Sequence, residues 1–162
     1  MMPTTKNTLQ KILFSILLLS AFFSCDSKKE QQPEVATNPN EITYISISHI
    51  GGTLGEYRII KVTRDSVFAE KGATVDRTHE EWASSITAET WTRLISSIQV
   101  KDLDHIKSSP SQQSVDGIDE TFQIRTPKKA HIFVNSFVDQ THYKQLQEFK
   151  EHLDNILPKE YK

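Results

Sequence analysis

The chain has 162 residues, a net charge of −2 and a single cysteine. This length suits one domain that buries about two thirds of the surface its unfolded chain would expose. The slightly acidic balance excludes nucleic acid and anionic lipid headgroups as partners, because both need a concentrated positive surface. A lone cysteine excludes an internal disulfide and a cysteine-based zinc site.

The start of the chain has the pattern of a lipoprotein signal peptide. Lys6 and Lys11 supply positive charge, and residues 12–23 form an apolar segment of 12 residues. This segment is shorter than the roughly 18 apolar residues that a membrane-spanning helix needs. It ends at Ser24 and Cys25, where cleavage and acylation of the cysteine are expected. An uncleaved anchor and an ordinary secretory signal are the alternatives.

Cleavage before Cys25 divides the chain into a signal peptide, residues 1–24, and a mature protein anchored by lipid. Loss of two lysines takes the net charge from −2 to −4. Residues 25–40 are expected to be the lipidated cysteine and a flexible tether, because their two prolines and many charges cannot form a core. We expect a single domain over residues 41–158 and a tail over 159–162. The expected location is the cell envelope, with the outer membrane as first choice and its periplasmic or surface side undecided.

The domain begins with a pattern of alternating residues. Ile45 and Ile47 alternate with Tyr44, Ser46 and Ser48, which is typical of a half-buried strand. A glycine-rich stretch then predicts a turn or bulge, not a phosphate loop, because it lacks the P-loop lysine and leads into a strand. Similar alternation predicts further strands over residues 57–62, 67–70, 74–82, 122–125 and 131–137.

Two helices are expected among these strands. Thr87 can cap the first helix, whose apolar stripe runs through Trp91 to Ile98. Asp139 can cap the last helix, which Pro158 ends. The apolar stripe of this helix comprises Leu146, Phe149, Leu153, Ile156 and Leu157. The fold class is therefore α+β: an antiparallel β-meander, a helix, a β-hairpin and a C-terminal helix packed on one sheet face.

Several weakly specific features give the domain a resemblance to a known group. They are a glycine-rich turn, a helix with a tryptophan, an Asp-Leu segment, a Ser-Pro loop and an Asp-Gly turn. The residues are Gly51, Gly52, Gly55, Trp91, Asp102, Leu103, Ser109, Pro110, Asp116 and Gly117. In these features residues 44–157 resemble small uncharacterised lipoproteins of Bacteroidota. The resemblance implies a fold and a compartment, and it carries no settled function.

The sequence has no motif that supports catalysis or a resident metal. It lacks a Gly-x-Ser-x-Gly elbow and a His-Glu-x-x-His helix, and its adjacent carboxylates would face opposite sides of a strand. Two half-sites are conceivable, one at His79 and Glu81 and one at Asp102, Asp104 and His105, but for each a solvated or capping role is the simpler interpretation. Residues 116–120 have too few oxygen ligands for an EF-hand loop and predict a turn into a strand. We expect no enzyme, no cofactor and no metal.

The remaining expectation is a binding role. An antiparallel sheet with helices on one face leaves its other face for contacts, and Tyr44, Ser46 and Ser48 would lie there. Trp82, flanked by acidic residues, is the better candidate of the two tryptophans for an exposed contact. We expect a monomeric, non-catalytic interaction module for an envelope protein, peptide or polymer. A periplasmic protein that binds a metal or small ligand is the alternative.

Overall fold

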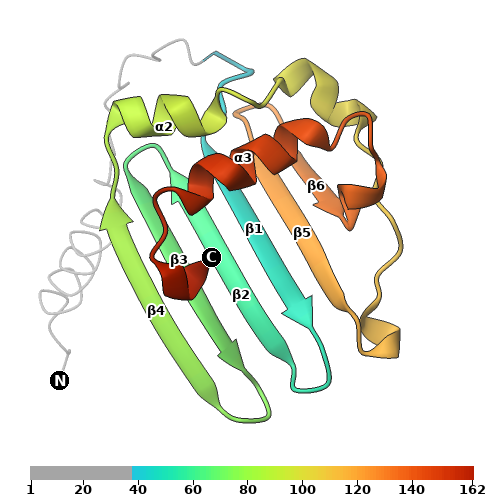
Figure 1. Cartoon of the computed structure of the whole chain (residues 1–162). Coiled ribbons are helices and arrows are strands. Elements are labelled where there is room, and N and C mark those ends of the chain that lie inside the picture. Colours follow the sequence, from blue (N-terminus) through green and yellow to red (C-terminus); the bar gives the residue numbers. More distant parts are fainter. Residues whose placement is uncertain (1–37) are drawn as a thin grey trace, which may run out of the picture. The chain divides into compact units, whose positions relative to one another are not determined.

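The computed structural model describes residues 38–162. Six antiparallel strands form one sheet in the order β4-β3-β2-β1-β5-β6 (Figure 1). The strands are β1 (Tyr44–Gly51), β2 (Glu56–Thr63), β3 (Ser66–Ala73), β4 (Thr78–Ser85), β5 (Ile118–Arg125) and β6 (Ala130–Val134). The first four strands follow one another through short turns, and β5 then pairs with the other edge of β1. With two helices beside this sheet, the α+β class is confirmed.

Two α-helices lie over the same face of the sheet (Figure 1). They are α2 (Ala88–Ile95) and α3 (Lys144–Asp154). Four short 3₁₀ helices complete the described part of the chain: Val100–His105, Gln113–Val115, Ser136–Val138 and Lys159–Tyr161. None of the helices among residues 38–162 has the length and apolarity needed to cross a membrane.

The core lies between the sheet and these helices. Alternation places Ile45 and Ile47 of β1 on the covered face, where both are buried. Strand register aligns Ile47 with one core-facing residue on each of the remaining strands. These residues are Phe133, Phe122, Ile60, Ala69 and Trp82. The helices cover these strands with a buried stripe of Trp91, Leu94, Leu146, Phe149 and Leu153. The predicted stripes of both helices therefore face the core.

The helix starts follow local chemistry. The Thr87 hydroxyl accepts a hydrogen bond from the Thr90 N–H at 3.1 Å, so the predicted cap of α2 is confirmed. The Asp139 carboxylate accepts from the N–H groups of Thr141 and His142. It caps the turn before α3 rather than α3 itself, which begins five residues later at Lys144.

The glycine-rich stretch is the turn between β1 and β2, as expected. Gly52 and Gly55 have φ angles of +75° and +61°, a region that residues with a Cβ atom rarely adopt. The stretch leads from one strand directly into the next.

The domain extends beyond both ends of the predicted range 41–158. Residues 38–40, expected as tether, form a turn in which the Glu41 N–H donates to the Asn38 carbonyl at 2.9 Å. Residues 159–162, expected as a tail, include a 3₁₀ helix whose Tyr161 side chain is only 7% exposed. The tail prediction was wrong because this aromatic ring belongs to the core. The predicted signal peptide, Cys25 and the tether up to residue 37 lie outside the described residues.

Candidate functional site

A row of polar side chains crosses the covered face, two residues beyond the apolar row. Register places Glu120, His49, Arg58, Lys71 and Glu80 side by side on β5, β1, β2, β3 and β4. Each lies two residues from a core position, so each projects to the side of the sheet that carries the helices. The apolar core is therefore bordered on this side by a row of charged and polar side chains.

Glu120 is the most buried member of this row, with 6% of its surface exposed. Its carboxylate accepts hydrogen bonds from Lys150 Nζ at 2.7 Å, Tyr143 Oη at 2.6 Å and His49 Nε2 at 3.1 Å. Burial alone would raise the pKa of this carboxyl, but the three donors outweigh it and lower the pKa to about 2. Burial and the neighbouring Glu120 charge raise the pKa of Tyr143. Glu120 is thus an ionised group that ties β5 to α3.

Hydrogen bonds continue from Glu120 to the middle of the sheet. His49 Nε2 faces Glu120, and its Nδ1 lies 3.4 Å from an Arg58 Nη2 donor. Arg58 Nη1 also donates to the Tyr161 carbonyl at 3.0 Å. Lys71 Nζ donates to the Glu160 carbonyl at 3.0 Å and pairs with Glu80 at 3.2 Å. The C-terminal 3₁₀ helix is held over the sheet by these two cations.

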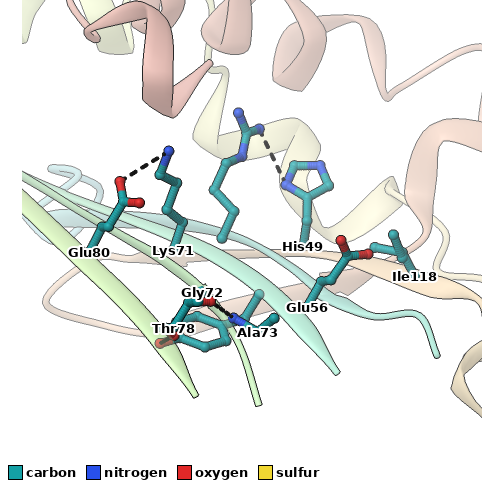
Figure 2. Close-up of a pocket in the computed structure, with 10 residues that line it drawn as sticks. His49, Glu56, Lys71, Gly72, Ala73, Thr78, Glu80 and Ile118 are labelled. Atoms are coloured by element: carbon teal, nitrogen blue, oxygen red, sulfur yellow. Dashed lines mark hydrogen bonds and ion pairs between the residues drawn. The ribbon is translucent and has the colours of Figure 1, made fainter. Parts of the chain in front are cut away.

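A cleft of about 420 Å³ opens where the helices stop covering this row. Figure 2 shows Glu80 of β4, Lys71 of β3 and His49 of β1 on the same side of the sheet, where they line the cleft. Its lining combines three basic groups (His49, Arg58, Lys71), two carboxylates (Glu56, Glu80) and apolar surface from Ala73 and Ile118. A volume of this size is in the range of small-ligand sites in proteins.

Arg58 is the cation in the cleft that has no acidic partner. Lys71 pairs with Glu80, whereas no ion pair among residues 38–162 includes Arg58. Its guanidinium uses two N–H groups on His49 and Tyr161, and it carries five in all. The remaining donors suit the planar, two-point binding of a carboxylate or phosphate.

The residues predicted as a binding surface do not form one surface. Tyr44, Ser46 and Ser48 lie on the face opposite the helices, where all three are half-buried. Arg125 lies over the Tyr44 ring at 4.6 Å. Trp82 lies on the covered face, half-buried, with its ring 6.3 Å from that of Tyr161. The expectation that Trp82 is an exposed contact was wrong, because β4 directs this side chain to the core.

The two conceivable half-sites differ in the structure. His79 and Glu81 do share a strand face, with Nε2 and Oε1 2.8 Å apart. Asp104 instead pairs with Lys129 at 2.5 Å and with His131 at 3.2 Å, and these partners belong to β6 and the turn before it. Among residues 38–162, one set of three potential metal-binding side chains has its ligand atoms within 4.8 Å of one another, namely Glu70, His79 and Glu81.

Residues 116–120 do lead through a turn into β5, and Asp119 holds the loop before this strand. Its carboxylate accepts from Ser111 Oγ at 2.5 Å, the Gln112 N–H at 2.8 Å and Asn135 Nδ2 at 2.7 Å. These bonds lower the pKa of Asp119, although burial opposes them. Both carboxylate oxygens are bonded to groups of the domain itself, so we assign Asp119 a structural role.

The sequence interpretation missed the polar row, although a signal for it was present. His49 continues the alternation of Ile45 and Ile47, and Glu120 lies two residues before the buried Phe122. Period two therefore places both on the core face. What the pattern lacks is the pairing of β5 with β1, which places these two side chains opposite each other.

The chain matches no protein-family model and no curated protein.

Proposed function

We propose that this chain is a lipid-anchored envelope protein that binds an anionic ligand and does not catalyse a reaction. The ligand class is a small molecule or peptide that carries a carboxylate or phosphate. The single observation that carries the proposal is Arg58, a guanidinium with no acidic partner among residues 38–162, at the floor of a cleft of about 420 Å³. A purely structural arginine on a core face would be expected to have a carboxylate partner.

Two further features support binding at this place. Ile118, 46% exposed, offers apolar contact at the side of the cleft, and Glu56 and Glu80 limit the ligands that fit by repelling excess negative charge. The proposal includes the arrangement expected from the sequence, in which a meander, a helix, a hairpin and a C-terminal helix place the helices on one sheet face. Such an arrangement leaves one end of that face uncovered.

The test measures how anionic probes change the thermal unfolding of the full-length chain in detergent. Succinate, triglutamate and pyrophosphate are the probes. A ligand at 100 times its Kd adds about 2.7 kcal/mol to the unfolding free energy by mass action. We expect at least one probe to raise Tm in the parent and not in Arg58→Gln.

Arg64→Gln is the matched control, since Arg64 is an exposed arginine in the turn between β2 and β3. It should keep the full probe-induced shift. The proposal fails if no probe raises Tm, or if the shift survives in Arg58→Gln.

A further inference from the structure

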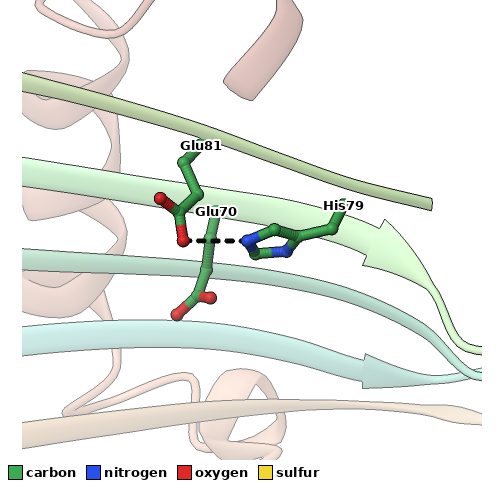
Figure 3. A group of neighbouring side chains, drawn as sticks. All are labelled: Glu70, His79 and Glu81. Atoms are coloured by element: carbon green, nitrogen blue, oxygen red, sulfur yellow. Dashed lines mark hydrogen bonds and ion pairs between the residues drawn. The ribbon is translucent and has the colours of Figure 1, made fainter. Parts of the chain in front are cut away.

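On the sheet face opposite the helices, β3 and β4 bring together one imidazole and two carboxylates. Glu70 and Glu81 are direct partners across the two strands, and His79 lies two residues before Glu81 on the same face. Figure 3 shows the three side chains converging. One ligand atom from each lies within 4.8 Å of the others. Because strand register fixes all three backbones, the cluster does not depend on a loop.

The His79 ring is held in place by a tyrosine that reaches across a whole strand. Tyr57, Gly72 and His79 form one row over β2, β3 and β4. Tyr57 Oη lies 2.7 Å from His79 Nδ1, and the two rings stack with centroids 6.1 Å apart. A Cβ atom on Gly72 would lie 2.5 Å from Tyr57 Oη, so a glycine is needed for the tyrosine to pass. Because Nδ1 contacts the Tyr57 hydroxyl, Nε2 is the ring nitrogen directed at the two carboxylates.

We propose that Glu70, His79 and Glu81 form a binding site for a divalent transition metal ion, with Zn²⁺ as the best match. One imidazole nitrogen and two carboxylate oxygens are ligands that zinc accepts, and water would take the fourth position. Zinc bonds of about 2.1 Å in a tetrahedron place neighbouring ligands about 3.4 Å apart. The three ligand atoms lie within 4.8 Å of one another, and His79 Nε2 and Glu81 Oε1 are 2.8 Å apart, so their separations bracket this spacing.

Tyr57 suits both the empty and the occupied state. Without metal, Nε2–H of a neutral His79 donates to Glu81, so Nδ1 accepts from the Tyr57 hydroxyl. With zinc on Nε2, the ring proton moves to Nδ1 and donates to Tyr57 Oη. The tyrosine proton then turns to the Thr78 carbonyl, which lies 3.5 Å away. The Tyr57 hydroxyl is thus the outer-shell partner that metal-binding histidines need.

Lys61 competes with the metal for one of the carboxylates. Its Nζ lies 2.9 Å from Glu70 Oε1, and this contact raises the pKa of Lys61. Zinc must displace the ammonium group to use that oxygen. The Lys61 ammonium also lies over the Phe68 ring, 5.1 Å from its centroid. Methionine is unbranched and packs favourably against aromatic rings, so at this position it would remove the competing charge and still suit Phe68. Lys61→Met should therefore bind zinc more tightly than the parent.

The experiment titrates Zn²⁺ into the full-length chain, purified in detergent without a polyhistidine tag. We expect one zinc per chain, a loss of at least tenfold in affinity for His79→Asn, and about tenfold for Tyr57→Phe. Lys61→Met should gain affinity. His105→Asn is the matched control, because His105 is an exposed histidine outside the cluster, and it should bind as the parent does.

A structural readout separates direct binding from damage to the fold. In a long-range ¹H–¹⁵N spectrum, zinc should move the His79 ring proton from Nε2 to Nδ1. The proposal is overturned if zinc affinity follows His105 instead of His79, or if the His79 ring does not change tautomer when zinc is bound. Arg58→Gln should bind zinc normally, so failure of the cleft proposal leaves this result unaffected.

Discussion

Glu120 shows how a single residue can be costly to bury and still stabilise the domain. A carboxylate that is 6% exposed needs donors to replace water, and α3 and β1 supply three of them. Because the folded-state pKa falls from 4.5 to about 2, ionised Glu120 favours the folded state. The stabilisation by Glu120 is complete above the pKa that this carboxyl has in the unfolded state. It is lost as the pH falls towards and through the pKa of the folded state.

We predict that acid removes about 3 kcal/mol of stability through Glu120 between pH 4.5 and pH 2, a figure that follows from the size of its pKa shift. In Glu120→Gln this part of the pH dependence should be absent, while the variant should be less stable at neutral pH. Urea unfolding at several pH values measures both effects. A Glu120→Gln profile parallel to that of the parent below pH 4.5 would contradict the assignment.

Among the elements, α2 is too short to be stable as an isolated helix and depends on its packing against the core. Eight residues are too few for a stable isolated helix, so its packing must stabilise it. Its two buried residues are Trp91, the larger, which is 4% exposed, and Leu94; the helix ends at Ile95. The predicted stripe continued to Ile98, which is also buried but lies beyond the helix.

We predict that Trp91→Ala lowers the free energy of unfolding by about 3 to 5 kcal/mol, because it opens a large cavity in the core. Trp82→Ala is the comparison within the same core. Trp82 is only half-buried at the edge strand β4, so its loss should be smaller. Denaturant unfolding followed by circular dichroism gives both values. Equal losses of unfolding free energy would contradict the prediction that Trp91 of α2 contributes more to the core than Trp82 of β4.

At the scale of the whole molecule, the described domain and the predicted anchor serve different purposes. The domain carries both proposed sites on opposite faces of one sheet, and the anchor would hold them at a membrane. A single acyl chain binds membranes only weakly, so a lipoprotein needs the additional chains of a fully modified cysteine.

We predict that Cys25→Ala abolishes acylation and moves the protein from the detergent phase to the aqueous phase in a phase-partition assay. Ser24→Ala is the control, because alanine also fits the position before the modified cysteine. It should partition like the parent. A Cys25→Ala variant that stays in the detergent phase would contradict the lipoprotein interpretation.

Most local elements of this domain could be predicted from the order of the residues. Period-two alternation identified the inward residues of β1 and β2, and helical spacing identified those of α2 and α3, because these periods follow from backbone geometry. Thr87 was readable as a cap for the same local reason. Strand ends were less accurate, as in β4, where 74–82 was expected and Thr78–Ser85 is observed.

The pairing of β5 with β1, which joins the hairpin to the meander, is visible only in the folded sheet. Alternation states which side a residue faces and contains nothing about the partner strand, which depends on contacts between distant parts of the chain. The pairing of β5 with β1 brings Glu120 to His49, and the position of β2 adds Arg58 to the same row. The return of the C-terminal 3₁₀ helix to the sheet supplies the carbonyl groups that Arg58 and Lys71 bind. Both proposed sites combine residues from several strands, so their assembly required the folded sheet.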